Sequence, residues 1–119
     1  MIRAHALAGF LVAATPAGAQ QGYSGNYYLS GCQAQVVIPN EISAELLARG
    51  SECLGAVKAI LAVASLLKEE NRFCSPHGSS VRQATAIIVR DLMNNPERSH
   101  RPLVEIGINA LQRAWPCGR

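Results

Sequence analysis

The sequence predicts an all-α fold, a small disulfide-stapled bundle of four to five helices. Apolar residues recur at intervals of three and four in several segments of residues 26–117, which is the spacing of one helix face. No segment alternates apolar and polar residues as a half-buried strand does. All four cysteines, Cys32, Cys53, Cys74 and Cys117, lie in this region. An even number of cysteines in a short exported chain is typical of a disulfide framework.

The first twenty residues differ in composition from the rest of the chain. Arg3 gives a positive start, residues 4–14 are apolar enough for the hydrophobic region of a signal peptide, and Ala17-Gly18-Ala19 has the small residues of a cleavage site. The apolar run is too short for a membrane span, which needs about 20 residues. We therefore predict a secretory signal peptide over residues 1–19, a flexible leader over residues 20–25 and one helical domain over residues 26–117, located in the periplasm.

The predicted mature chain carries little net charge. The eleven Lys and Arg residues without Arg3 leave ten, against eight Asp and Glu, so the net charge is about +2. So small a charge argues against nucleic acid or an anionic membrane as the main partner. Aromatic residues make up 5% of the sequence, too few for a base-stacking surface. The remaining residues are enough for one small domain.

Two short helices are predicted before the centre of the domain. Asn26 can cap a first helix through "YYLSGCQAQ", in which Tyr28 and Cys32 fall four residues apart on one face. Pro39 ends this region. The following stretch "EISAELLARG" is expected to add a turn of helix that Gly50 closes.

The central helix is predicted over residues 51–68, with Ser51 as its N-cap. Its small residues Ala59, Ala62 and Ser65 are expected to let another helix approach closely. The alanine-rich helix is expected to be buried in the core of the bundle, with a helix–helix contact in a homodimer as the alternative. Lys58 and Lys68 lie off the apolar stripe. The stripe itself consists of Cys53, Val57, Ile60, Leu61, Ala64 and Leu67.

Two further helices complete the predicted bundle. Pro76 and Gly78 interrupt the helical pattern, and Ser80 with Gln83 forms a capping box that begins a helix from Val81 to about Met93. Pro102 suits the first turn of the last helix, "LVEIGINALQRAW". This helix is predicted to bury Leu103, Ile106, Ala110, Leu111 and Trp115.

Helix length and direction decide between the three connectivities that four cysteines allow. The helix over residues 51–68 is about 26 Å long, at about 1.5 Å per residue, and Cys53 and Cys74 lie near its opposite ends. A disulfide joins Cα atoms no more than about 7 Å apart, so these two cannot bond. Because short connections make successive helices antiparallel, Cys117 returns to the Cys74 end. We predict the bridges Cys32–Cys53 and Cys74–Cys117.

Catalytic motifs are absent from the predicted mature sequence. Its histidines are His77 and His100, and it has no Cys-x-x-Cys pair, no glycine-rich phosphate loop and no His-Glu-x-x-His. Cys74 and His77 have the spacing of two metal ligands, but they form half of a site. In an oxidising compartment a disulfide is favoured over zinc. The sequence therefore predicts no enzyme, no metal site and no cofactor.

Two predicted loops carry side chains of the kind that dominate protein–protein recognition. The loop over residues 68–77 combines charged residues with an aromatic, and the loop over residues 96–102 combines arginines with a histidine between two prolines. A solvated turn between helices is the alternative interpretation of both. The candidate partner-binding residues are Lys68, Glu69, Glu70, Asn71, Arg72, Phe73, His77, Glu97, Arg98, His100 and Arg101.

The cysteine spacing and the motifs around it resemble the Rap/Tai-type immunity proteins. The resemblance covers residues 25–117 and includes "CLG", "FCSPHG", "NPERSHRP" and the terminal "WPC". Three positions, Ala56, Ala59 and Ala62, depart from the family pattern of an aromatic, a glycine and an acidic residue, so the resemblance does not identify which particular effector is bound. The matching residues are Cys32, Cys53, Leu54, Gly55, Phe73, Cys74, Pro76, Gln83, Pro96, Arg98, Ala110, Leu111, Pro116 and Cys117.

The resemblance implies a periplasmic inhibitor that is not an enzyme. Proteins of that family protect bacteria from peptidoglycan amidases delivered by type VI secretion, so the implied partner is such an amidase, whose active-site cleft a rigid loop would block. The family also implies a homodimer. The alternatives are a periplasmic helical stress chaperone and a family member with a different protein partner. The predicted mature chain has only two histidines, so few side chains could change charge to drive a pH-dependent chaperone.

Overall fold

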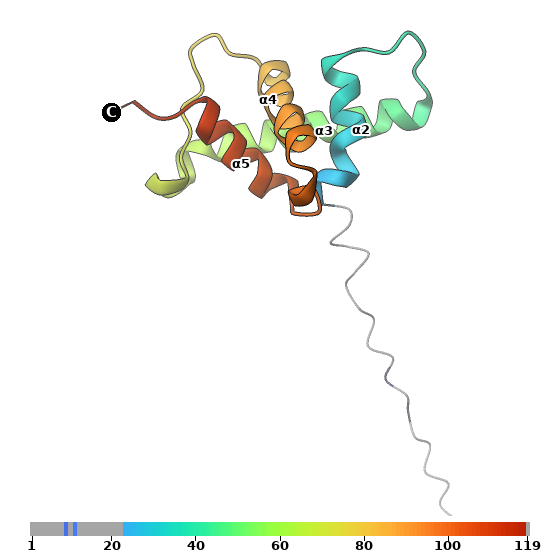
Figure 1. The fold of residues 1–119 in the computed structure, drawn as a ribbon, viewed down its shortest axis with the longest axis horizontal. Coiled ribbons are helices and arrows are strands. Elements are labelled where there is room, and N and C mark those ends of the chain that lie inside the picture. The colour runs from blue at the N-terminus through green and yellow to red at the C-terminus, as the bar shows by residue number, and fades with distance from the viewer. Residues whose placement is uncertain (1–8, 10, 12–22, 119) are drawn as a thin grey trace, which may run out of the picture.

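Four α-helices, joined by loops and short 3-10 turns, form the domain (Figure 1). The computed structural model describes residues 23–118, together with Gly9 and Leu11, so the predicted signal peptide lies almost entirely outside the described residues. The helices are α2 (Gly25–Val36), α3 (Ala44–Val63), α4 (Val81–Asn94) and α5 (Leu103–Ala114). This part of the chain contains no strand, which confirms the predicted all-α class.

α2 begins earlier than predicted. Ser24, not Asn26, is its N-cap, and the Ser24 hydroxyl accepts a hydrogen bond from the backbone N–H of Tyr27 at 3.2 Å. The N–H of Gly25 donates to the carbonyl oxygen of Arg101 at 2.9 Å. The expected flexible leader over residues 20–25 therefore does not reach Gly25, because backbone hydrogen bonds to a distant segment fix its last residues.

α3 is one continuous helix of 20 residues, where we expected a turn and a separate helix. The hydroxyl of Ser43 caps it by accepting from the N–H of Leu46 at 3.0 Å. Ser51 lies inside the helix, and its hydroxyl donates to the carbonyl oxygen of Leu47 at 3.1 Å. The predicted cap at Ser51 is wrong because an interior serine can bond within the preceding turn. Among the helices described, none combines the length and the apolar character needed to cross a bilayer.

Two glycines let α2 and α3 cross at close range. A Cβ atom on Gly31 would lie 2.3 Å from the carbonyl oxygen of Arg49, and one on Gly50 would lie 2.3 Å from the side-chain amide nitrogen of Gln35 on α2. Gly50 thus serves the helix crossing and does not end a helix as expected. One disulfide fastens this crossing: Cys32 and Cys53, both fully buried, have Cα atoms 5.3 Å apart.

α3 presents its small residues to solvent. Val57 and Ile60 are buried along the predicted stripe, whereas Ala59 and Ala62 are exposed. The close approach of another helix that their small size suggested does not occur within the described domain, because these two alanines fall on the exposed face of α3. α3 ends at Val63, and the 3-10 turns Ala64–Leu66 and Glu69–Asn71 follow it.

α4 and α5 confirm the sequence prediction closely. The capping box of α4 is present: the Gln83 N–H donates to the Ser80 hydroxyl at 3.1 Å, and the Ser80 N–H donates to the Gln83 side-chain oxygen at 2.8 Å. In α5 the predicted apolar residues are buried, except that Trp115 is half-buried. The core of the described domain comprises Cys32, Cys53, Val57, Ile60, Phe73, Ala84, Ile88, Val89, Leu92, Leu103, Ile106 and Leu111.

The second disulfide joins Cys74 to Cys117 with Cα atoms 4.7 Å apart, so both pairings are the predicted ones. It links the chain between α3 and α4 to the segment that follows α5. The backbone N–H of Cys74 also donates to the carbonyl oxygen of Trp115 at 2.8 Å. The C-terminal segment is therefore held by a covalent bond and a neighbouring hydrogen bond.

Removal of this bridge by Cys74→Ser with Cys117→Ser is expected to lower the free energy of unfolding by about 4 kcal/mol, from the chain-entropy model and a separation of 43 residues. Trp115, the single tryptophan, is half-buried beside the bridge. Its fluorescence in a urea titration measures the loss, and its emission should shift to longer wavelength before any denaturant is added.

The matched control is Cys32→Ser with Cys53→Ser. It opens a loop of 21 residues and should cost about 3 kcal/mol while leaving the native emission of Trp115 unchanged. An unchanged emission spectrum in both double variants would contradict the assignment of the Cys74–Cys117 bridge as the fastener of the C-terminal segment.

Candidate partner-binding site

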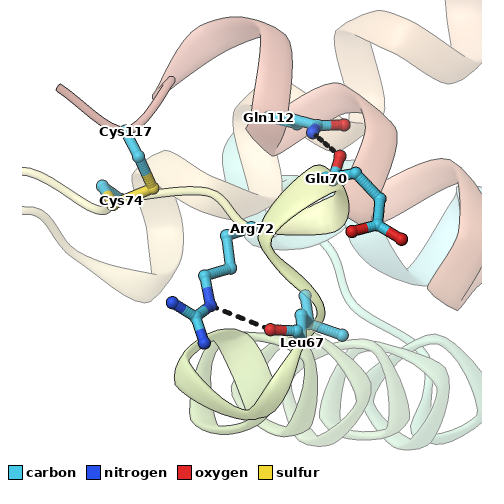
Figure 2. The surroundings of a disulfide bond; sticks show 6 residues. All are labelled: Leu67, Glu70, Arg72, Cys74, Gln112 and Cys117. Atoms are coloured by element: carbon cyan, nitrogen blue, oxygen red, sulfur yellow. Dashed lines mark hydrogen bonds between the residues drawn. A yellow bond between two sulfur atoms is a disulfide. The ribbon is translucent and has the colours of Figure 1, made fainter. Parts of the chain in front are cut away.

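The first candidate loop, residues 68–77, begins as a turn packed against α5. The side-chain amide of Gln112 donates to the backbone carbonyl of Glu70. Figure 2 shows the Arg72 side chain pointing toward Leu67, the residue that follows the 3-10 turn Ala64–Leu66. The Nε of Arg72 donates to the carbonyl oxygen of Leu67 at 2.8 Å. The 3-10 turn Glu69–Asn71 is closed by a bond from the Asn71 N–H to the Lys68 carbonyl oxygen at 2.8 Å. The backbone of this part is thus fixed at both ends.

Phe73 and Cys74 form the base of the 68–77 loop. The side chain of Phe73 is only 3% exposed and belongs to the hydrophobic core. The expectation that Phe73 lies on an exposed loop is wrong, since its ring is part of the hydrophobic core and is not on the surface. Cys74 is bonded to Cys117, so its sulfur cannot act with His77 as a metal ligand. Within the described part of the chain, no group of three or more His, Cys, Asp or Glu could hold a metal ion.

The tip of the 68–77 loop is a tight turn. The N–H of Ser79 donates to the carbonyl oxygen of Pro76 at 3.0 Å, which closes a four-residue β-turn. Gly78, the third residue of that turn, has φ +80°, the value that a type II turn requires there and that favours glycine. His77 therefore stands at the corner, and its side chain is exposed. Figure 1 shows the yellow stretch before α4 arching away from the helices.

The second candidate loop, residues 96–102, is fastened to the start of α2. Ser99 is buried, and its carbonyl oxygen accepts from the N–H of Asn26 at 2.8 Å. The Ser99 hydroxyl donates to the carbonyl oxygen of Pro96 at 2.7 Å. On the other side the N–H of Leu103 donates to the carbonyl oxygen of Tyr23 at 2.7 Å. This loop is therefore a rigid turn that covers the N-terminal end of α2.

The arginines of the 96–102 loop are paired within the chain. Arg98 lies 3.8 Å from the carboxylate of Asp91, and Arg101 forms an ion pair with Glu105. Asp91, whose side chain is 14% exposed, also accepts a hydrogen bond from Arg113. These arginines contribute to the fold, so fewer of their donors are available to a partner.

The two loops lie at opposite ends of α5. The 96–102 loop leads into its first residue, whereas the 68–77 loop is tied to its end through Trp115 and Cys117. The 12 residues of α5 span about 17 Å at about 1.5 Å per residue. The structure thus does not bring the candidate residues into one patch. Of these residues Phe73 is buried, Arg98 is partly exposed, and Lys68, Glu69, Glu70, Asn71, Arg72, His77, Glu97, His100 and Arg101 are exposed.

One surface cluster was not predicted. The hydroxyl of Tyr27 donates to the carboxylate of Glu52 at 2.9 Å, and the Arg49 guanidinium lies 4.9 Å from the Tyr27 ring centroid. The hydrogen bond to Glu52 raises the pKa of Tyr27, and burial raises the pKa of Tyr28. The sequence does hold a sign of this cluster, since all three tyrosines lie within residues 23–28. Only the folded structure shows that Tyr27 contacts Glu52 and Arg49 of α3.

The profile of the Rap1a immunity proteins matches residues 24–117, which is most of the sequence. The chain therefore belongs to the Rap1a immunity protein family. No curated protein and no solved structure gives a significant match. Membership of this family implies that the chain is an immunity protein, whose partner is a secreted protein effector.

Asp91→Asn is expected to destabilise the domain by about 1–2 kcal/mol, because it removes the charge that faces Arg98 and Arg113 at a mostly buried position. Urea unfolding followed by Trp115 fluorescence measures the change. Glu97→Gln is the control, since Glu97 is exposed and lies 3.9 Å from Arg98; it should change stability by less than about 0.5 kcal/mol. Equal stability of both variants would show that Asp91 does not fix the 96–102 loop.

Proposed function

We propose that this member of the Rap1a immunity family is exported to the periplasm and there inhibits a peptidoglycan amidase effector of type VI secretion. The tip of the 68–77 loop enters the active-site cleft of the amidase and excludes its substrate. The observation that carries this proposal is the construction of the loop: an exposed turn around His77 stands on a base that Phe73 and the Cys74–Cys117 bridge anchor. Family membership supplies the class of partner.

Rigidity of the tip supports its role as the inserted element. The turn from Pro76 to Ser79 is closed by a backbone hydrogen bond, and Cys74 just before it is covalently fixed. A loop that is ordered before binding loses less conformational entropy in the complex, so more of the contact energy appears as affinity. The bridge therefore serves affinity as well as stability.

The shape and chemistry of the tip suit a narrow polar cleft. Small residues flank His77: Ser75 and Pro76 precede it, and Gly78 and Ser79 follow it. Only the imidazole extends, and it offers one donor and one acceptor when neutral. Amidases of this kind resemble cysteine hydrolases with a narrow groove, so steric exclusion by the turn is sufficient for inhibition. No catalysis by the inhibitor is needed.

The periplasmic location is supported by two features. The predicted signal peptide would direct export, and the two disulfides require an oxidising compartment to form and persist. The 96–102 loop is the weaker candidate for the main contact, because Arg98 and Arg101 already pair with carboxylates of the chain. We assign it a secondary role at the rim of the interface.

The two histidines allow a matched test of the two loops. His77→Glu should weaken inhibition of the cognate amidase effector at least tenfold, because it places a larger charged side chain at the corner that enters the cleft. His100→Glu makes the same change at an exposed position of the 96–102 loop and should alter inhibition less than twofold. The measurement is the inhibition constant for peptidoglycan hydrolysis by the purified amidase.

The reverse order of effects would assign the main contact to the 96–102 loop. Unchanged inhibition in both variants would contradict loop insertion altogether. If the unmodified protein binds no amidase, the proposed target is wrong, whatever the loops do.

A further inference from the structure

A recess in the surface, which we call the α2–α4 groove, lies away from both candidate loops. It has a volume of about 720 Å³ and is bounded by α2, α4, the connection over residues 37–43 and the first turn of α3. The 68–77 loop, by contrast, is held by α5, on the other side of α4 (Figure 1). The groove is lined mostly by apolar side chains, among them Ala34, Val36, Leu46, Ala86, Val89 and Met93.

The apolar surface continues beyond the α2–α4 groove. Val37, on the connection that follows α2, lines the groove and is 75% exposed. Beyond it, Ile38 on the same connection is 68% exposed and Leu47 on α3 is 53% exposed. No described part of the chain covers these side chains. Contiguous apolar surface of this kind on a small soluble protein marks an interaction site. The exposed apolar side chains lie on the connection and on α3 as well as inside the recess, and this spread favours a polypeptide as the occupant.

The charge of the groove restricts its occupant. Arg90 is the one charged side chain among the lining residues, and it forms no hydrogen bond or ion pair with the described residues. No acidic side chain lines the groove. An apolar surface with one unpaired guanidinium matches a segment that carries a carboxylate among apolar residues. Every other described arginine is already engaged within the chain: Arg49, Arg72, Arg82, Arg98, Arg101 and Arg113.

The length of the groove sets the size of the segment. Along α4 the lining runs from Ala86 to Met93, about 11 Å at about 1.5 Å per residue, which equals two helical turns. A helix in such a groove presents anchors at positions i, i+3 or i+4, and i+7. We propose that the α2–α4 groove binds a two-turn amphipathic helix of a partner protein, with apolar anchors in the groove and one acidic side chain on Arg90. This binding is separate from the insertion of the 68–77 loop.

The probe is a library of random 12-residue peptides displayed on phage. The library is first depleted on Ala86→Glu, which puts a charge inside the groove, and is then selected on the disulfide-intact, unmodified protein. Selected peptides should show apolar residues at helical spacing together with Asp or Glu. As synthetic peptides they should bind Ala86→Glu at least tenfold more weakly than the unmodified protein. Ala59→Glu, on the uncovered face of α3, is the control and should change affinity less than twofold.

Arg90→Glu tests the charge pairing. This variant should bind the acidic peptides at least fivefold more weakly than the unmodified protein does. Peptides in which Lys replaces the acidic residue should bind the variant with the affinity that was lost. Equal urea midpoints of all variants exclude a folding defect. The proposal is wrong if selected peptides bind Ala86→Glu and the unmodified protein alike, or if they show no preference for acidic residues. It is also wrong if the protein alone sediments as a dimer that Ala86→Glu dissociates, because the groove then belongs to a second copy.

Discussion

The Cys74–Cys117 bridge is the constraint on which the rest of the structure depends. It joins two segments 43 residues apart in sequence, and the Cys74 amide donates to the Trp115 carbonyl beside it. Without these bonds the chain between α3 and α4 would be a long irregular connection, of the kind that is commonly mobile. With them it becomes a fixed base, and Phe73 adds an apolar anchor below the exposed turn. The bridge thus converts a connection into a surface that can be presented to a partner.

At the other end of α5 the 96–102 loop is also fixed to a distant segment, but by hydrogen bonds and not by a disulfide. Backbone hydrogen bonds from Gly25 and Asn26 to the 96–102 loop replace the covalent link. A domain of this size buries too little apolar surface to hold long loops by packing alone. The disulfide and the backbone hydrogen bonds between sequence-distant segments therefore keep these loops ordered. α4 stands between the two kinds of surface that result, the braced loops near α5 and the open apolar groove beside α2.

Features set by local spacing could be predicted from the sequence, and features set by packing could not. The disulfide pairing followed from the length and direction of the helices, although Cys53 lies in the middle of α3 and not near its start, and the Ser80–Gln83 box followed from a three-residue interval. The cap at Ser51 failed because the same residue type can bond inside a helix. Phe73 lies in a polar stretch, so its burial shows only once the helices have packed into a core. The α2–α4 groove needs two helices about fifty residues apart in sequence to pack side by side, which no local pattern records.

Disulfide mapping of the protein isolated from the bacterial periplasm tests the central claim most directly. Mass spectrometry of proteolytic fragments under non-reducing conditions should show a mature chain that starts at Gln20. It should also show two crosslinked fragment pairs, one joining Cys32 to Cys53 and the other joining Cys74 to Cys117. Free thiols at Cys74 and Cys117, a different pairing, or a protein retained in the cytoplasm would contradict the account of an exported domain with a covalently braced binding loop.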